Sequence, residues 1–343
     1  MQPISLGLIG ATGAVGQEVL RLLEEKGFPL RELRCFASAK SAGTTLPFRG
    51  ENLVVHTLSK EGLAGLDIAL FSAGRKISFT FAPEAVAKGV KVVDNSSAFR
   101  MREDVPLIVP EVNLQALQPS HQIIAVPNCC AILLSVVIAP LMRAVPIERL
   151  VIATYQAASG AGLRAMQELQ EETAAVLEGK SYKRSIMPHP YAFNLFPHNS
   201  PFDDAVGYAE EEIKIQEELR KILNAPKLPI HATCVRVPVL RAHSMAVNIT
   251  FSHPFEVERA YEVLKSAEGV EVVEERASNR FAMPVDATCQ DKVLCGRIRK
   301  DPSCPNTLDL WIVGDQLRKG AALNALQIAM MPQILKAPLS QGG

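Results

Sequence analysis

The segment ISLGLIGATGAVG, residues 4–16, decides the fold that the sequence predicts. Its first six residues form a short apolar run typical of a buried strand, and the apolar spacing over 15–25 predicts a helix. A strand, a turn with the spacing G-x-x-G-x-x-G and a helix are typical of a dinucleotide site, where helix N–H groups bind a pyrophosphate. An ordinary glycine-rich turn is the alternative. The residues predicted to contact a cofactor here are Gly10, Thr12, Gly13, Ala14, Val15 and Gly16.

The rest of the first third repeats this alternation of strands and helices. Further strands are predicted over 32–37, 68–72, 90–94 and 121–126, with an alanine-rich helix over 81–87. Because strands that alternate with helices form parallel sheets, the expected fold class is α/β, beginning with a Rossmann-type, doubly wound nucleotide-binding domain.

The middle of the chain has a pattern typical of a mixed α+β domain. Residues 245–251 alternate between apolar and polar, as in a strand with one covered face. The expected elements are strands over 150–155, 233–240, 245–251 and 308–313, helices over 163–177, 210–223 and 316–335, and an irregular stretch over 183–204. We therefore expect one domain over 1–128, a second over 129–314, and a C-terminal helix, 315–336, that packs back on the first.

The composition excludes several functional classes. Of the 343 residues 48% are hydrophobic, which excludes a disordered chain, and 36 basic against 36 acidic side chains leave no basic excess for binding nucleic acid. Seven cysteines without a C-x-x-C pair argue against a disulfide framework or a metal site, and favour a reducing compartment. The longest apolar stretch, 131–145, is interrupted by a proline and an arginine, and we recognise no signal peptide. We expect a cytoplasmic protein that does not enter membranes.

Residues 35–43, CFASAKSAG, indicate which dinucleotide the turn binds. An NAD site usually has an acidic residue about 20 residues after the glycines, on the ribose 2′-hydroxyl. This stretch has no carboxylate, whereas Lys40 with Ser38 and Ser41 can hold a 2′-phosphate. The pattern favours NADP, and a solvated loop lysine is the alternative for Lys40.

Two cysteines, Cys129 and Cys130, follow Pro127 and Asn128 where a predicted strand gives way to an apolar helix. The positive end of a helix dipole lowers the pKa of a thiol there, and the thiolate is the nucleophilic form. The alternative is a buried cysteine that only packs in the apolar core. Together with a nicotinamide cofactor, a thiolate at this junction indicates oxidation or reduction of a carbonyl through a thioester.

These motifs, taken in order, resemble aspartate-semialdehyde dehydrogenases over residues from about 4 to about 330. The matching segments are GATGAVG at 10–16, ASAKSAG at 37–43, DNSSAFR at 94–100, PNC at 127–129, TYQAASGAG at 154–162, RVPV at 236–239 and HS at 243–244. The resemblance implies NADP as cofactor, a second domain for catalysis and dimerisation, and a homodimer formed through the sheet of that domain.

The resemblance also implies a role for each matching residue. It makes Cys129 the nucleophile, His243 the acid/base and Gln156 a residue that positions the acyl group, and it leaves Cys130 structural, where the family often has Ser or Thr. It implies that Arg236 binds the substrate carboxylate and that Glu211 binds the substrate amine. The residues implied for phosphate are Arg100, Lys214 and Asn128, and those implied for the cofactor are Ser72, Gly74, Ser159, Gly160 and Gln316. From burial statistics and spacing alone, Arg236 would be a strand-surface residue and Glu211 with Lys214 a solvated helix pair.

The implied reaction is the NADPH-dependent conversion of L-4-aspartyl phosphate to L-aspartate 4-semialdehyde and inorganic phosphate. It belongs to lysine (diaminopimelate), threonine and methionine biosynthesis. N-acetyl-glutamyl-phosphate reductase is the nearest alternative, and a free substrate amine beside Glu211 separates the two. A non-catalytic NADP-binding homologue is the alternative from another class, against which the presence of both Cys129 and His243 argues.

Overall fold

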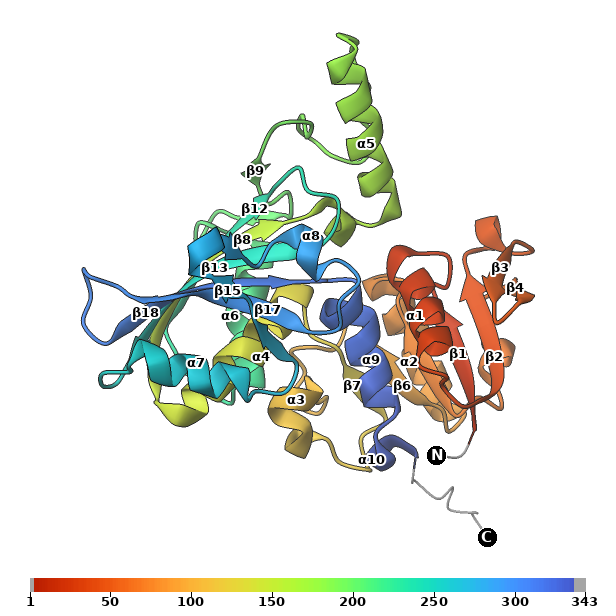
Figure 1. The fold of residues 1–343 in the computed structure, drawn as a ribbon. Coiled ribbons are helices and arrows are strands. Elements are labelled where there is room, and N and C mark those ends of the chain that lie inside the picture. Colours follow the sequence, from red (N-terminus) through yellow and green to blue (C-terminus); the bar gives the residue numbers. More distant parts are fainter. Residues whose placement is uncertain (1–2, 336–343) are drawn as a thin grey trace. The chain divides into compact units, whose positions relative to one another are not determined.

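A computed structural model of the chain describes residues 3–335 (Figure 1). The chain divides into two compact units, one formed by the described residues up to Asn128 together with those from Ala321 onward, the other by Cys129–Gly320. Each unit contains its own seven-stranded sheet. Among the described residues, no helix is both long and apolar enough to cross a membrane.

The sheet of the first unit is parallel except at one edge, and its strand order is β3-β4-β2-β1-β5-β6-β7. The α/β prediction for this part of the chain is therefore confirmed. The sequence did not indicate the antiparallel edge hairpin of β3 and β4. The strands are β1 Ile4–Ile9, β2 Leu30–Ala37, β3 Thr45–Phe48, β4 Glu51–Thr57, β5 Ile68–Phe71, β6 Lys91–Asp94 and β7 Ile123–Ala125.

Helices α1 (Ala14–Glu25) and α2 (Arg75–Ala87) follow β1 and β5. The short helix α3 (Pro110–Asn113) follows β6. Near the C-terminus, α9 (Leu323–Ala329) contacts β6, α1 and α3, and the side-chain amide of Asn324 donates to the carbonyl of Ile108 at 2.9 Å. This contact joins two segments that are far apart in the sequence.

The prediction of one continuous helix over 316–335 is wrong. A π-helix spans Arg318–Ala322, α9 follows directly, and a separate turn, α10 (Pro332–Leu335), comes last. Pro332 lacks the N–H that a continuing helix would need, which accounts for the break before α10. Residue 336, the last of the predicted helix, lies outside the described residues.

The sheet of the second unit is mixed, with the order β14-β17-β18-β13-β8-β12-β9. Helices α4, α6 and α7 pack together and against its strands, and α4 is almost entirely buried. The strands are β8 Ile147–Gln156, β9 Phe196–Pro197, β12 Ile230–Arg236, β13 His243–Phe251, β14 Val270–Val272, β17 Val293–Lys300 and β18 Thr307–Gly314. The helices are α4 Cys129–Ala144, α5 Leu163–Leu177, α6 Glu210–Ile222, α7 Val257–Lys265 and α8 Pro284–Ala287.

The predicted strand 233–240 is wrong at its end, because β12 stops at Arg236. Pro238 has no N–H to give to a ladder, and the Val239 N–H turns back to the carbonyl of Val237 at 2.7 Å. The chain therefore leaves the sheet directly after Arg236.

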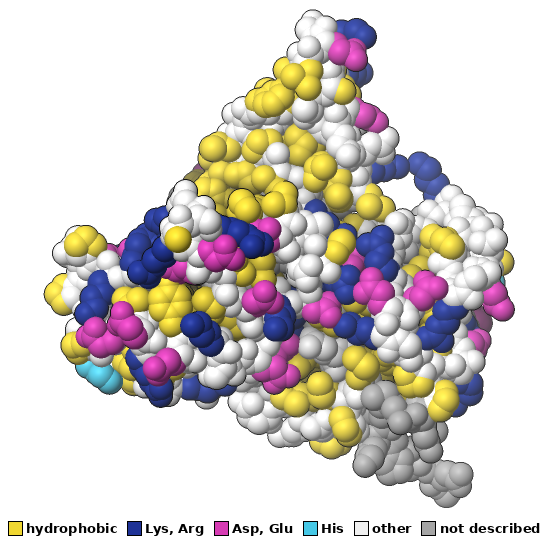
Figure 2. Space-filling view, viewed as in Figure 1, with side chains coloured by type: hydrophobic (Ala, Val, Ile, Leu, Met, Phe, Trp, Pro, Cys, Tyr) yellow, Lys and Arg dark blue, Asp and Glu magenta, His cyan; other side chains and the backbone are white. Residues whose placement is uncertain are grey.

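One face of the second sheet is only partly covered. In β8 and β13 the buried residues alternate with partly exposed ones, as the alternation over 245–251 predicted. The partly exposed set includes Val151, Ala153, Tyr155, Ala246 and Asn248. Figure 2 shows further apolar side chains on the surface of this unit, and the exposed ones include Phe193, Leu195 and Phe202.

Replacing Gly10 with alanine tests the turn that begins the fold. Gly10 has a φ of +90°, and a Cβ there would lie 2.4 Å from the carbonyl oxygen of Ser72. Gly27 has a φ of +58° but nothing within 4 Å of a Cβ, so Gly27→Ala is the matched control. We expect Gly27→Ala to lower the free energy of unfolding by about 1 kcal/mol, and Gly10→Ala by ~1–3 kcal/mol more because of the clash. Equal losses in urea denaturation would contradict this account of the turn.

Candidate active site

Three adjacent strands of the second sheet bring polar side chains into one row. Gln156 ends β8 and lies in register with Arg236, which ends β12. On the other side of β8, Ser244 pairs with Tyr155, so His243 at the start of β13 lies one residue further along the same edge. All three side chains are at least nine-tenths buried. The sheet therefore gathers the three residues that the sequence motifs had singled out.

Cys129 lies at the first position of α4, beside Cys130 and His243. The two sulfur atoms and an imidazole nitrogen lie within 4.8 Å of one another. A hydrogen bond from the Cys130 thiol holds the pKa of Cys129 well below its usual value, with further help from His243, although burial opposes this. The pKa of Cys130 is correspondingly raised, by its hydrogen bond to Cys129 and by burial. Cys129 is therefore the thiolate of the pair.

The same three side chains are a possible metal site. In the part of the chain that the structure describes, they are the one group of this kind whose ligand atoms come close enough to hold an ion. Two sulfur donors and an imidazole suit a soft or borderline ion such as Zn²⁺. Our expectation of no metal stays a prediction.

The backbone orients the imidazole of His243. The N–H of Ala157 donates to Nδ1 of His243 at 3.0 Å. A nitrogen that accepts a hydrogen bond cannot also carry the proton of the neutral ring, so the proton is on Nε2. Nε2 has no hydrogen-bond partner among the described residues, and the ring lies beside the sulfur of Cys129. The arrangement leaves the Nε2–H available to donate to the sulfur of Cys129.

A buried cation and a buried anion flank Gln156. Arg236 is 5% exposed, and its Nε donates to Oδ1 of Asn199 at 3.2 Å. Glu211 is 8% exposed, and its Oε1 accepts from Nε2 of Gln156 at 3.2 Å. The alternatives that treated both as solvated surface residues are therefore wrong. Lys214 differs, because it is only partly buried and its Nζ forms an i,i+4 ion pair with Glu210 at 2.8 Å.

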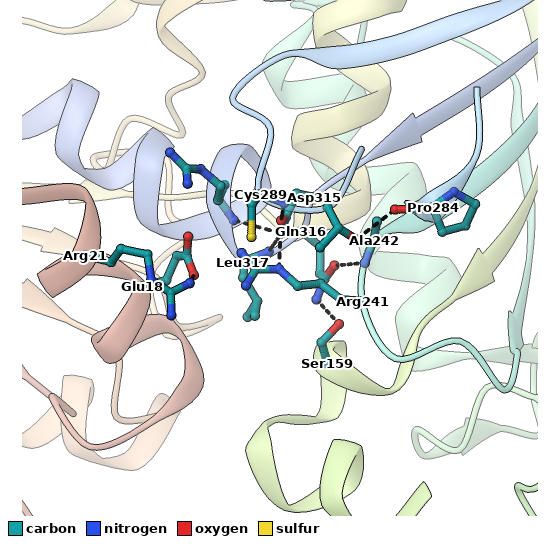
Figure 3. Close-up of polar contacts among 12 residues, drawn as sticks. Glu18, Arg21, Ser159, Arg241, Ala242, Pro284, Cys289, Asp315, Gln316 and Leu317 are labelled. Atoms are coloured by element: carbon teal, nitrogen blue, oxygen red, sulfur yellow. Dashed lines mark hydrogen bonds and ion pairs between the residues drawn. The ribbon is translucent and has the colours of Figure 1, made fainter. Parts of the chain in front are cut away.

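The loop after β8 leaves no room for a side chain at Gly160. A Cβ there would lie 3.0 Å from Nε2 of His243 and 3.1 Å from Nη1 of Arg236. Next to it, the Ser159 hydroxyl accepts from the side-chain amide of Gln316, whose oxygen accepts the Ala242 N–H at 3.1 Å (Figure 3). Three residues that the motifs assign to the cofactor thus lie around one buried polar cluster.

Asp315 fixes the neighbouring loops to one another. This carboxylate is fully buried and forms an ion pair with Arg241 at 2.7 Å (Figure 3). It also accepts the backbone N–H groups of Cys289 and Leu317, at 2.7 and 2.9 Å. The sequence analysis missed it, although an acidic residue next to Gln316 at the end of an apolar strand was a signal.

The first unit contains a cavity of about 370 Å³ around the glycine turn. Helix α1 begins after Gly13, a residue with no side chain to cap the first N–H groups, so these groups suit an anionic ligand. A Cβ at Gly16 would lie 2.3 Å from the carbonyl of Gly10, so the turn requires glycine there. The residues that line the cavity include Gly10, Thr12, Gly13, Ser38, Thr57, Ser72 and Phe81. These features fit a dinucleotide.

The other predicted cofactor residues of the first unit are neighbours, along the chain, of residues that line this cavity. Ala14, Val15 and Gly16 form the first turn of α1, and Gly74 precedes α2 with a φ of +87°. Lys40 and Ser41 lie in the short 3₁₀ turn Ala39–Ser41, which Ser38 precedes, and Lys40 is exposed. The lining thus includes Ser38 but neither Lys40 nor Ser41.

Arg100 lies at the carboxyl end of the first sheet. Its Nε donates to the carbonyl of Val126 at 2.9 Å and its Nη2 to the carbonyl of Asn95 at 2.7 Å. Asn128 is the last residue of the first unit and directly precedes Cys129. Their assignment to phosphate, like that of Lys214, stays a prediction.

The sequence analysis also missed the segment 198–200. Asn199 accepts from Arg236, and the Ser200 hydroxyl accepts the backbone N–H of Glu211 at 3.1 Å. His198 lies beside them, with a pKa lowered to about 4 by burial first and then by the charge of Arg236. The segment lies in an irregular, proline-rich stretch that has no period to align, and three consecutive polar residues after Pro197 were its one signal.

Comparison with known proteins gives a consistent result over both units. Residues 5–120 match the family described as semialdehyde dehydrogenase, NAD binding domain, and residues 138–319 match semialdehyde dehydrogenase, dimerisation domain. Together they bear out the predicted fold class, an N-terminal nucleotide-binding domain followed by a mixed α+β domain.

Relatives and solved structures agree with this match. The chain is 54% identical to an aspartate-semialdehyde dehydrogenase of Synechocystis sp. over 95% of this chain and 96% of the relative, and 42% identical to that of Bacillus subtilis over 95% and 96%. A crystal structure of aspartate semialdehyde dehydrogenase II from Vibrio cholerae, complexed with ASA, superposes with a TM-score of 0.92 at 40% identity, covering 96% of this chain and 98% of that one.

The hydrogen bond between the two cysteines predicts how Cys129 reacts. In Cys130→Ala the donor is lost, the pKa of Cys129 rises, and alkylation of Cys129 by iodoacetamide at pH 7 slows by about tenfold. Cys130→Ser keeps an O–H donor and is expected to keep the rapid reaction. The rate is measured by mass spectrometry of the Cys129 peptide, so that labelling of the exposed Cys289 does not interfere. An unchanged pH–rate profile in Cys130→Ala would show that Cys130 does not stabilise the thiolate.

Proposed function

Because the chain belongs to the aspartate-semialdehyde dehydrogenase family, we propose that it converts L-4-aspartyl phosphate to L-aspartate 4-semialdehyde with NADPH, and catalyses the reverse reaction. The observation that carries the proposal is the row of buried polar side chains next to Cys129. A thiolate, an imidazole, a guanidinium and a carboxylate lie together there, and each has a matching group on this substrate. The chain is thus an oxidoreductase with an NAD(P)-binding domain.

Cys129 acts as the nucleophile in this proposal. Its thiolate attacks the acyl carbonyl of aspartyl phosphate, the carbon–oxygen bond to phosphate breaks, and a thioester remains on the sulfur. NADPH held by the first unit would supply the hydride that reduces the thioester carbonyl. The C–S bond of the thiohemiacetal oxyanion then breaks as its C=O bond forms, and His243, in the acid/base role, stabilises the departing thiolate through Nε2–H. The N–H groups of the first turn of α4 face the developing oxyanion, as a helix N-terminus can.

The charges of the substrate have separate partners. Arg236 binds the α-carboxylate through its planar guanidinium, Glu211 binds the α-amine, and Gln156 between them positions the acyl chain. Arg100, Lys214 and Asn128 receive the phosphate. Because Glu211 is a buried carboxylate, it suits a positively charged free amine, and an acetylated amine carries no positive charge to pair with it. This favours aspartate semialdehyde over N-acetylglutamate semialdehyde.

We further propose that the first unit binds NADP and that two copies of the chain associate through the partly covered face of the second sheet. The absence of a carboxylate over 35–43 and the presence of Lys40 and Ser38 favour NADP over NAD. The partly exposed residues of β8 and β13, Tyr155 among them, offer a surface suited to a second copy. A role in lysine, threonine and methionine biosynthesis and a location in the cytoplasm stay predictions.

The reaction is tested in the oxidative direction. Purified protein with aspartate semialdehyde, NADP and phosphate is expected to form NADPH at 340 nm only when phosphate is present. Cys129→Ala is expected to lower kcat by about 10³-fold or more, because the nucleophile is lost. N-acetylglutamate semialdehyde is expected to give a kcat/KM at least ~100-fold lower. Phosphate-independent activity, or a preference for the acetylated substrate, would refute the proposal.

The preference for NADP is tested at Lys40. Lys40→Ala is expected to raise the KM for NADP by about tenfold and to leave the KM for NAD unchanged, because only NADP has a 2′-phosphate. Lys88→Ala, at an exposed lysine that follows α2, is the matched control. If Lys40→Ala changes neither value, Lys40 is a solvated loop residue and the basis for NADP preference lies elsewhere.

A further inference from the structure

One buried nitrogen beside the proposed substrate site has no role in the chemistry described so far. Nε2 of His198 is inaccessible to solvent and has no hydrogen-bond partner among the described residues. A polar group that is buried without a partner costs about 1–3 kcal/mol, so such a group at a site indicates a ligand that completes it.

The other nitrogen of His198 determines which atom carries the proton. Nδ1 accepts the backbone N–H of Ser200 at 3.2 Å. Burial, and secondly the positive charge of Arg236, lower the pKa of His198 to about 4, so the ring is neutral near pH 7. A neutral ring that accepts at Nδ1 has its proton on Nε2. His198 therefore presents a hydrogen-bond donor, and an oxygen is the group that it can bind.

The strand pairing places this donor beside Arg236. β9 runs antiparallel to β12, with Phe196 opposite Arg236 and Pro197 opposite Val235, and the N–H of His198 donates to the carbonyl of Cys234 at 2.9 Å. Side chains two residues apart on a strand share a face. His198 thus lies over Cys234, on the face of β12 that Arg236 also occupies.

The residues that follow His198 are tied to the two charged groups of the site. Asn199 accepts from Nε of Arg236, and Ser200 accepts the backbone N–H of Glu211. The segment 198–200 therefore holds its position relative to the cation and the anion that the proposed substrate needs. The bond from the Ser200 N–H to Nδ1 fixes the direction of the His198 ring.

We propose that Nε2–H of His198 donates a hydrogen bond to the α-carboxylate of the substrate, next to Arg236. The inference rests on the proposed function. An anionic oxygen is the acceptor that suits a buried donor beside a guanidinium, because both groups then bind one carboxylate. His198 is thereby a binding residue that selects substrates with a free carboxylate.

Two substitutions separate this role from a structural one. His198→Asn keeps an acceptor near the place of Nδ1, and so keeps the bond from Ser200, but it removes the donor at Nε2. His198→Gln places an amide N–H near Nε2 and loses the acceptor for Ser200. We expect His198→Asn to raise the KM for aspartate semialdehyde by about tenfold or more with little change in kcat, and His198→Gln to stay within about threefold of the unsubstituted protein.

Two controls accompany these variants: a substitution at a nearby histidine, and an assay with a substrate that lacks the carboxylate. His189→Asn, at an exposed histidine of the same irregular stretch, is expected to leave the KM unchanged. With 3-aminopropanal, which lacks the carboxylate, the unsubstituted protein and His198→Asn are expected to have equal kcat/KM. Far-UV circular dichroism and thermal unfolding confirm that each variant is folded.

The outcomes distinguish failure of this inference from failure of the proposed function. If the unsubstituted protein does not act on aspartate semialdehyde, the proposed function is wrong. If it does, and His198→Asn keeps the original KM while His198→Gln loses it, His198 only supports the loop. An equal effect of His198→Asn on both substrates would likewise overturn the contact with the carboxylate.

Discussion

The peptide groups of one residue, Ala157, hold the two principal side chains of the site. Its N–H donates to Nδ1 of His243 at 3.0 Å, and its carbonyl accepts from Nη1 of Arg236 at 3.3 Å. The first bond places the proton of the neutral imidazole on Nε2, and the second orients the guanidinium. Because a backbone group has no rotamers to lose, it orients both the imidazole and the guanidinium at little entropic cost. On the proposed function, a shift of Ala157 would therefore disturb acid/base chemistry and substrate binding together.

The position of Ala157 depends in turn on contacts between loops that are distant in the sequence. The N–H groups of Ala158 and Ser159 donate to the carbonyls of Val239 and Leu240, at 2.8 and 3.0 Å. Asp315 adds the ion pair to Arg241. The loop after β8, the loop after β12 and the segment after β18 thus form one cross-linked edge of the sheet. Such support from neighbouring loops lets a site built on loops reach the precision that catalysis requires.

The sequence predicts those parts of the molecule that depend on residue patterns within one short segment. The glycine turn, the parallel strands and the alternation over 245–251 depend on spacing within one segment, and each was found. Cys129 and His243 could be singled out because each lies in a short motif, and the structure places them side by side. The helix over 316–335 was wrong because the same helix-forming composition allows a π-helix, and the chain there approaches Cys129, where a Cβ at Gly320 would lie 3.1 Å from the Cys129 Cβ. The position of His198 depends on pairing of a two-residue strand, which no local period reveals.

Opposite charges are buried on either side of Gln156, an arrangement that suits a zwitterion. Arg236 donates to the side-chain oxygen of Asn199, and Glu211 accepts from the side-chain amide of Gln156. Each charge has lost much of its hydration and interacts strongly with an ion of opposite sign. On the proposed function, aspartate semialdehyde brings a carboxylate and an amine at the spacing of one carbon atom. A molecule with only one of these groups lacks one of the two favourable charge interactions, so discrimination follows from electrostatic complementarity.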